Sequence, residues 1–421
     1  MKRNHLLIIF VIFFCLIVSS EAWSEISITK PEDVGLSSER LNRISETLKA
    51  HTEKGVIPGA VVLVARRGKI AYFESFGVRN LGTGSPMQKD TIFQIYSMSK
   101  PITSVAAMQL HEQGRFYLGD PVSKFISEFN QMEVGIEKTD PTTGEKTFST
   151  EPAKSQITMH DLLRHTSGLT YGFMGTSKIN MMYKEAGLSN PDQTLEEMVM
   201  KISKLPLTSQ PGTRWGYSRS TDVLGRVIEV ISGISLSKYI EENILQPLQM
   251  NNTGFYVKPE NIEMVAKPGP KAHWPSVYPT SPPKLFLGGQ GMVSTAADYL
   301  HFIQMLMNGG QLDGLRLLGK NTVEYMTADH LGSSIPKKGP GYFLGEGTGF
   351  GLGFAVRESL GLPAVPGKVG DYAWMGVGGT SFFVSPSEEL CAVFMAEAND
   401  MGIMAYYARL FKTMVMQAIV D

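Results

Sequence analysis

Phe93-Gln94-Ile95-Tyr96-Ser97-Met98-Ser99-Lys100 places a serine and a lysine three residues apart among apolar neighbours. A serine hydroxyl is a weak nucleophile at neutral pH and needs a base within hydrogen-bond reach. Positions three apart lie on one face of a helix, and the following run, residues 104–111, carries apolar side chains at helical spacing. The sequence therefore predicts a buried helix in which Lys100 activates Ser97.

The Ser-x-x-Lys pattern also occurs at four other places, Ser27 to Lys30, Ser235 to Lys238, Ser281 to Lys284 and Ser334 to Lys337. At each of these the lysine can reach water, so a solvated structural role is favoured. Ser97 differs because its hydrophobic neighbours bury Lys100, and burial of an unpaired charge is unfavourable. To act as a base, Lys100 must lower its pKa from about 10.4 toward about 7, a change of roughly 4 kcal/mol. Burial and a second cation can do this together.

Apolar runs at both ends of the chain predict the strands of one sheet. Residues 60–65 and 70–73 are β-rich runs around a glycine turn, and residues 372–377, 381–384 and 390–395 are three more runs between turns. The stretch from 158 to about 242 is mainly helical in pattern, and a helical tail covers 404–419. We expect an α+β fold with an antiparallel sheet flanked by helices, formed by residues of about 30–115 and 285–421, and a mainly helical part at about 116–284.

Composition excludes several classes of protein. The chain has 421 residues with 43% hydrophobic and 19% charged residues, which is typical of a globular protein. Its formal net charge of −1 provides no field that would attract nucleic acid. Of its two cysteines, Cys15 lies in the N-terminal leader and Cys391 in an apolar run, so we expect no internal disulfide and a buried Cys391. No His-x-x-His or Cys/His cluster suggests a metal, and no cofactor is expected.

The N-terminus has the pattern of a secretory signal peptide over residues 1–22. Lys2 and Arg3 precede an apolar stretch from Leu6 to Val18, and small residues at Ser20 and Ala22 suit signal peptidase. A helix of this apolar length spans about 20 Å, short of the roughly 30 Å hydrocarbon core. We therefore expect a periplasmic or secreted protein without a stable membrane span, whose catalytic domain covers 23–421.

Proton transfer to a leaving group needs a further polar residue, and Tyr217 in Trp215-Gly216-Tyr217-Ser218 is the candidate, although a tyrosine in this context also suits simple packing. The chain resembles the serine β-lactamase-like superfamily, in its class C-like branch of esterases, acyltransferases and D-amino-acid peptidases. Four segments in order carry the resemblance: residues 93–100, 161–169, 217–225 and 288–298. It implies a β-lactamase/transpeptidase-like fold, an acylated Ser97, and proton transfers shared by Lys100 and Tyr217. The family uses the segment with His165 structurally.

Two departures from the family pattern bear on the substrate. Arg219 stands where the family's Tyr-x-Asn motif has asparagine, and Trp374 stands where a Lys-Thr-Gly strand has lysine. That lysine binds a substrate carboxylate, whereas tryptophan offers an apolar wall and one N–H donor. Arg219 can instead pair with Asp222. Gly376 permits close backbone approach, so the N–H groups of Val377 and Ser97 can form an oxyanion hole.

The sequence leaves three hypotheses for the function. The first is an exported carboxylesterase that acts on small uncharged esters through an acyl-serine. The second is a D-alanyl-D-alanine peptidase or weak β-lactamase, and the third is a catalytically silent, penicillin-binding-like envelope protein. The natural acyl group, the acceptor and the oligomeric state do not follow from the sequence.

Overall fold

The computed structural model describes residues 27–269, 272–274, 276, 278–339 and 341–421. The expected signal peptide, residues 1–22, lies outside them. In the described part an eight-stranded sheet runs in the order β10-β11-β12-β13-β14-β1-β2-β3, and every neighbouring pair is antiparallel. Its strands are β1 (Gly59–Arg66), β2 (Lys69–Asn80), β3 (Ser85–Pro86), β10 (Thr348–Phe350), β11 (Ala355–Arg357), β12 (Tyr372–Gly376), β13 (Thr380–Ser385) and β14 (Leu390–Ala396). Pairing of β1 with β14 joins the two ends of the chain, as the sequence predicted.

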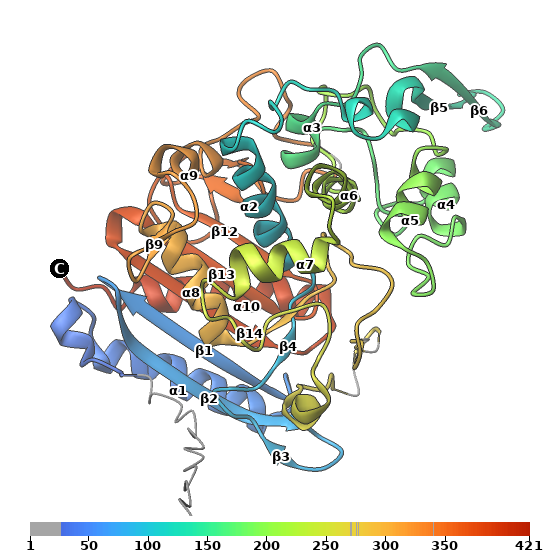
Figure 1. The fold of residues 1–421 in the computed structure, drawn as a ribbon. Helices are drawn as coiled ribbons and strands as arrows, with labels where there is room; N and C mark the ends of the chain where they lie inside the picture. The colour runs from blue at the N-terminus through green and yellow to red at the C-terminus, as the bar shows by residue number, and fades with distance from the viewer. Residues whose placement is uncertain (1–26, 270–271, 275, 277, 340) are drawn as a thin grey trace, which may run out of the picture.

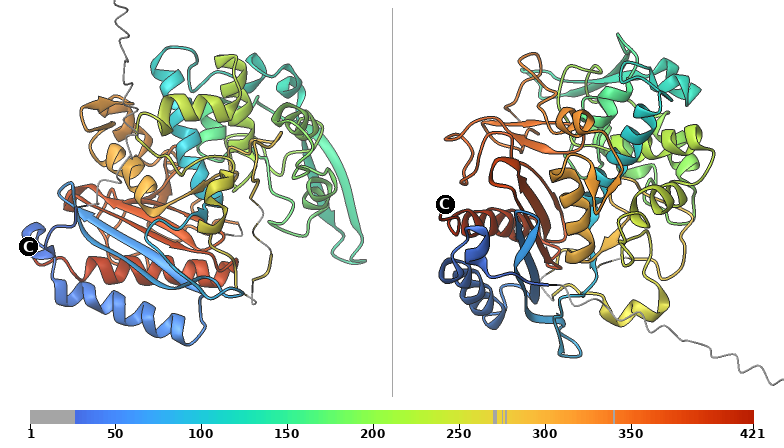
Figure 2. Two further views of the ribbon diagram at one scale, coloured as in Figure 1. Left: turned by 60° about the horizontal axis from the view of Figure 1, so that its bottom comes forward. Right: turned by 60° about the vertical axis from the view of Figure 1, so that its left-hand side comes forward.

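Helices cover both faces of this sheet (Figure 1 and Figure 2). α1 (Ser38–Glu53) and α10 (Met401–Met416) lie on one face, and α8 (Ala296–Met307) packs on the other. β1 is buried along its whole length because its alternate side chains enter two cores. Its even-numbered residues from Ala60 to Val64 pack with α1 and α10, and its odd-numbered residues from Val61 to Ala65 join the larger core on the α8 side.

The chain between the two halves of the sheet is mainly helical (Figure 1). Its helices are α3 (Met159–Leu163), α4 (Lys178–Glu185), α5 (Leu195–Ile202), α6 (Ser220–Ser232) and α7 (Leu236–Ile240), which continues as a π-helical turn, Glu241–Leu245. The polar stretch 131–156 forms a hairpin of β5 (Glu133–Thr139) and β6 (Lys146–Pro152). The run Asp140-Pro141-Thr142-Thr143-Gly144 in this polar stretch predicts a tight turn at the surface, but the two strands beside it were not predicted. The proposed boundaries of the helical part, about 116–284, stay a prediction.

Shorter elements complete the described fold. They are 3-10 helices at Pro31–Val34, Tyr96–Met98, Val122–Lys124, Ser127–Gln131, Pro259–Met264 and Pro386–Glu388, the strand pairs β4 (Phe93–Gln94) with β7 (Val293–Ser294) and β8 (Gln311–Leu312) with β9 (Leu315–Arg316), and the helix α9 (Lys320–Met326). None of the described helices is long and apolar enough to cross a bilayer.

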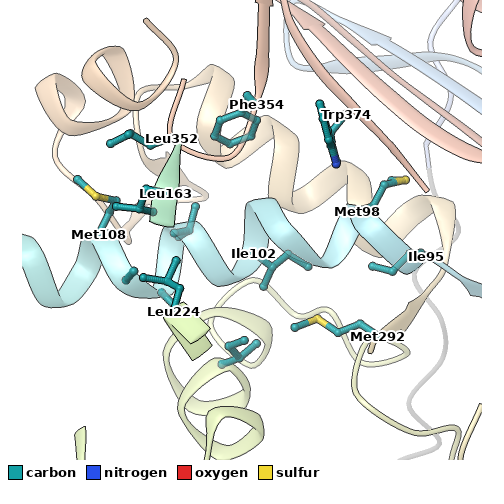
Figure 3. Packing of buried hydrophobic residues seen from close by; sticks show 14 of the residues in the cluster. Ile95, Met98, Ile102, Met108, Leu163, Leu224, Met292, Leu352, Phe354 and Trp374 are labelled. Atoms are coloured by element: carbon teal, nitrogen blue, oxygen red, sulfur yellow. The ribbon is translucent and has the colours of Figure 1, made fainter. Parts of the chain in front are cut away.

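α2 (Ser99–Glu112) runs through the largest core and is buried from Ser99 to Leu110. Ile102 and Met108 pack among residues of the sheet side, such as Phe354 and Trp374, and of the helical side, such as Leu224 (Figure 3). Contacts of α2 with α6 and α7 continue this packing. A helix enclosed on all sides keeps water away from any polar group at its first turn, where Lys100 lies.

Candidate active site

Ser97 lies in a short connection that is fixed from several sides. It belongs to the 3-10 helix Tyr96–Met98, which leads directly into α2. The backbone N–H of Ile95 donates to the carbonyl of Met292 at 3.0 Å, and the Tyr299 hydroxyl donates to the carbonyl of Met98 at 2.9 Å. Tyr96, directly before the serine, has φ 43°, a left-handed conformation that a tyrosine adopts only under constraint from its surroundings.

Lys100 is 1% exposed and its amino group has three partners. Nζ lies 3.2 Å from Ser97 Oγ, 3.1 Å from the hydroxyl of Tyr171 and 2.6 Å from the carbonyl oxygen of Gly289. Burial lowers the pKa of Lys100 to about 7, the Asp222 carboxylate opposes this shift, and the Arg219 guanidinium supports it. At neutral pH a large share of this amine is therefore uncharged and can accept the proton of Ser97.

Tyr217 lies close to the serine and the lysine. Lys100 Nζ is 4.5 Å from the centroid of the Tyr217 ring. Burial raises the pKa of Tyr217, and the Ser97 and Trp374 side chains oppose the increase. Among the described residues, neither Tyr217 Oη nor Trp374 Nε1 has a hydrogen bond of normal geometry. The hydroxyl thus faces the serine with capacity for a further partner.

The sequence did not single out Tyr171. Its hydroxyl accepts a 3.1 Å hydrogen bond from Lys100 Nζ, the same amino group that contacts Ser97. Its ring centroid lies 5.5 Å from that of Tyr217, and its backbone carbonyl accepts a 2.8 Å hydrogen bond from Asn180 Nδ2. Burial raises the pKa of Tyr171. The available signal was its position two residues after Leu169, where one of the four family-like segments ends.

Arg219 and Asp222 form the ion pair that the sequence suggested. Arg219 Nη1 lies 3.1 Å from Asp222 Oδ2, and both side chains are buried. Arg219 also donates to Ser189 Oγ at 2.8 Å, while Asp222 Oδ1 accepts the Gly289 N–H at 2.8 Å. Asp222 therefore orients the carbonyl partner of Lys100, a contact that sequence reasoning missed.

The end of β12 packs against the segment that carries Ser97. A Cβ on Gly376 would lie 2.3 Å from the carbonyl oxygen of Ile95, so only glycine permits this approach. Val377 follows at the turn, and Trp374 is buried two residues earlier. The structure thus brings Trp374, Gly376 and Val377 to the site together with the catalytic candidates.

Aromatic side chains surround the site. Phe343 is 48% exposed, and its ring centroid lies 5.5 Å from that of Tyr217 and 6.3 Å from that of Trp374. Phe173 is 66% exposed and stacks on Tyr171 at 4.9 Å. A cavity of about 360 Å³ also borders Tyr217, beside the β5 strand. The open side of the site therefore presents apolar rings.

His165 is buried, and its Nδ1 lies 3.3 Å from Ser218 Oγ. Burial and the nearby Lys100 charge hold its pKa well below the usual range, so this histidine is neutral. Its φ of 58° and its contacts with the Trp215 and Tyr217 rings agree with a structural role. In the described part of the chain, no group of three His, Cys, Asp or Glu side chains could hold a metal ion.

A model of the Beta-lactamase family matches residues 44–410. The chain belongs to this family. "Protein Rv1367c" of Mycobacterium tuberculosis is 33% identical over 357 residues, which cover 82% of this chain and 87% of that protein. "Esterase EstB" of Burkholderia gladioli is 30% identical over 372 residues, with the same coverage of 82% and 87%. "Lovastatin esterase" of Penicillium rubens is 27% identical over 383 residues, covering 84% and 92%.

Solved structures with this fold are similar to the chain over most of its length. EstCE1, described as a hydrolase with promiscuous acyltransferase activity, superposes with a TM-score of 0.74 at 26% identity, covering 91% of this chain and 99% of that one. A penicillin-binding protein homologue from Pyrococcus abyssi has a TM-score of 0.63 at 23% identity, covering 87% and 76%. The chain is thus a serine hydrolase of the carboxylesterase-like type, in a β-lactamase/transpeptidase-like fold, as the sequence predicted.

Proposed function

We propose that this protein is an exported carboxylesterase that hydrolyses small uncharged esters through an acyl-Ser97 intermediate. The observation that carries the proposal is the Lys100 amine, which lies 3.2 Å from Ser97 Oγ in surroundings that lower its pKa to about 7. A base with this pKa can accept a proton near neutral pH and return it later in the cycle.

In the first half of the reaction, Ser97 Oγ attacks the ester carbonyl while neutral Lys100 takes the hydroxyl proton. The N–H groups of Ser97 and Val377 bind the resulting oxyanion, an arrangement in which one donor can contribute about 3 kcal/mol. Tyr217 donates its proton to the leaving alkoxide and regains one from the Lys100 ammonium, which lies over its ring. The alcohol departs and the acyl group remains on Ser97.

In the second half, water replaces the alcohol. Tyr217 accepts a proton from the attacking water and passes its own proton to neutral Lys100, and the oxyanion forms in the same place. Ser97 Oγ then leaves as it takes a proton from the Lys100 ammonium. Each proton that Lys100 accepts is thus returned within one cycle. Ser97 recovers its hydroxyl, and the products are an acid and an alcohol.

The preference for uncharged esters rests on the residues around the nucleophile. Trp374 occupies the position where the family's strand carries a cation for a substrate carboxylate, and its indole is buried against Tyr217 at a ring separation of 5.5 Å. Arg219 is held by Asp222 and Ser189. The exposed Phe343 and Phe173 rings add apolar surface. The esterase relatives EstB and lovastatin esterase support the same reaction class.

The test compares turnover of a p-nitrophenyl butyrate ester with that of a chromogenic cephalosporin. We expect rapid ester cleavage and little cephalosporin turnover, both lost in Ser97→Ala. Fast cephalosporin turnover without ester cleavage would favour the peptidase or β-lactamase hypothesis. Intact-mass labelling with a fluorophosphonate addresses the third hypothesis, because a silent binding protein would give no adduct that depends on Ser97.

The export part of the proposal rests on the leader pattern of residues 1–22. Expression of the full chain in a host with a periplasm should yield a protein that starts at about residue 23 and appears outside the cytoplasm. Intact mass after fractionation measures both properties. A full-length protein in the cytoplasmic fraction would contradict this part alone.

A further inference from the structure

A short segment after β14, Glu397–Asn399, contacts both sides of the candidate oxyanion hole. Asn399 Oδ1 accepts a 3.3 Å hydrogen bond from the Tyr96 hydroxyl, and Tyr96 directly precedes the nucleophile. The backbone N–H groups of Ala398 and Asn399 both donate to the carbonyl of Gly378, at 2.7 and 3.0 Å. Gly378 directly follows Val377, the second candidate donor. One segment therefore holds the chain on each side of the place where the oxyanion forms.

The conformation of Tyr96 indicates that its contacts are maintained against strain. Tyr96 has φ 43°, and a left-handed tyrosine persists only when its surroundings fix it, whereas asparagine adopts the φ of 50° seen at Asn399 more readily. A Cβ on Gly378 would lie 2.5 Å from Cε2 of Tyr96, so the Tyr96 ring packs directly against the backbone of the turn after β12. Asn399 Nδ2 is itself held by the carbonyl of Trp274 at 2.9 Å.

Glu397 connects the same segment to the strand before the nucleophile. Its side chain is buried, with Oε2 accepting the Gln94 N–H at 3.3 Å and Oε1 accepting the Ser276 hydroxyl at 2.6 Å. Burial is the main influence on this carboxyl and raises its pKa to about 8. Among the described residues, the titratable neighbour that influences it is Tyr96. Beyond Asn399, His273 and Asp400 lie 3.4 Å from each other.

The catalytic steps proposed above do not use this carboxyl, although it contacts the strand that leads to the nucleophile. A neutral acid fits its buried position, because the described residues supply hydrogen bonds to it and none of them forms an ion pair with it. A carboxylate in the same place would require water or a rearrangement of the segment. Either change would loosen the connections to Tyr96 and Gly378.

We propose that Glu397 and Asn399 are positioning residues, which keep Ser97 and the Val377 amide in their catalytic positions while Glu397 is protonated. When Glu397 ionises, these positions are no longer maintained. The inference rests on the proposed esterase function of Ser97. It predicts that different groups limit activity at the two ends of the pH profile. Ionisation of Lys100 sets the decline at acid pH, and ionisation of Glu397 sets the decline at alkaline pH.

The experiment is the pH profile of kcat/KM for p-nitrophenyl butyrate in the full chain. The wild type should lose activity above about pH 8, and Glu397→Gln, which is isosteric and cannot ionise, should retain its plateau there. Asp298→Asn is the matched control, because Asp298 is also a buried carboxyl with a raised pKa but is bound by Asn252 and Thr253. This control should keep the alkaline decline. An alkaline decline unchanged in Glu397→Gln, or none in the wild type, would overturn the proposal.

Tyr96→Phe tests the connection without removing a charge. Loss of the hydroxyl bond to Asn399 should lower kcat by roughly 10- to 100-fold with little change in KM, since small misplacements of reacting groups have effects of this size. Tyr183→Phe removes another buried hydroxyl, one without a hydrogen-bond partner among the described residues, and should leave kcat unchanged. Equal kcat values in Tyr96→Phe and wild type would contradict the positioning role.

Fluorophosphonate labelling separates this proposal from the function on which it rests. If wild-type Ser97 forms no adduct, the esterase function fails. If Ser97 is labelled but Glu397→Gln and Tyr96→Phe behave as the wild type, only the positioning role fails.

Discussion

Replacing Asp222 by asparagine should make Lys100 a weaker base and move the acid limb of the pH profile downward. The Asp222 charge raises the pKa of Lys100 against the effect of burial. A Cβ on Gly289 would lie 3.1 Å from Asp222 Oδ1 and 3.3 Å from Lys100 Nζ, so these two atoms are at most about 6.4 Å apart. Two unit charges at that distance interact by roughly 2.6 kcal/mol at an effective dielectric constant of about 20. This energy corresponds to about 2 pH units.

The assay is kcat/KM for a short-chain ester from about pH 4.5 to about pH 9. The wild type should reach half of its plateau near the Lys100 pKa of about 7, and Asp222→Asn should reach half of its own plateau near pH 5. The asparagine can still accept the Gly289 N–H now bound at 2.8 Å, so the loop geometry is kept. The unpaired Arg219 should reduce stability by roughly 3–5 kcal/mol, which thermal unfolding measures.

Two controls make the result specific. Asp298→Asn, a buried carboxyl bonded to Asn252 and Thr253, should leave the acid limb near pH 7. The double variant Arg219→Met with Asp222→Asn removes both charges, so its acid limb should lie between those of the wild type and Asp222→Asn. An acid limb of Asp222→Asn that stays near pH 7 or rises would refute the electrostatic reasoning.

Three further predictions concern other parts of the molecule. Gly376→Ala should lower both esterase activity and Tm, because its Cβ would lie 2.3 Å from the Ile95 carbonyl oxygen and 2.4 Å from Thr380 Oγ1; unchanged values would show that this approach is not required. Glu397 has its pKa raised from 4.5 to about 8, so the stability it contributes is complete below pH 4.5 and is lost as pH rises to about 8. The free energy of unfolding in urea of Glu397→Gln, relative to that of the wild type, should therefore rise by roughly 5 kcal/mol from pH 4 to pH 9. The same difference in unfolding free energy at both pH values would contradict this. Cys391 is buried and burial raises its pKa, so it should react with a thiol reagent only as fast as the protein unfolds, and rapid labelling of the native protein would disagree.

The strands and the catalytic helix could be predicted because their signals are local. Apolar runs at 60–65 and 390–395 became β1 and β14, which are buried on both faces and thus read as continuous apolar stretches. The burial of Lys100 that its apolar sequence neighbours predicted is also present, since the residue is 1% exposed and burial lowers its pKa to about 7. Context also separated Ser97 from Ser235, which caps α7 while Lys238 remains exposed.

The hairpin of β5 and β6 gave no such signal. Most of its residues are exposed, and the alternation of apolar and polar residues that marks a half-buried strand is limited to Val134 and Ile136 in β5. The turn around Asp140, whose carboxylate accepts the N–H groups of Thr142 and Thr143, was predictable from its Asp-Pro sequence. A hydrophobic pattern cannot report a strand that buries little apolar surface.

The connections between elements were beyond local pattern. Tyr171 reaches Lys100 across 71 positions of the chain, and Tyr96 meets Asn399 across 303. In the sheet, β14 pairs with β13, which precedes it in the sequence, and also with β1, which comes from the other end of the chain. This second pairing is what brings Asn399, just after β14, close to Tyr96. Such pairs follow from strand order, which no single segment of sequence contains.

The two titrating groups near Ser97 act in different ways because they lie in different layers. Lys100 is surrounded by α2, α6 and the loop around Gly289, so charges on those elements set the pKa of the base itself. Glu397 lies at the end of β14 and contacts the strand before the nucleophile, so its ionisation changes positions rather than the basicity of Lys100. A charge change at Asp222 should therefore move only the acid limb of the profile, and one at Glu397 only the alkaline limb. If both substitutions shifted the same limb, the two groups would be coupled through a single titration, and the separation of base and positioning element would not hold.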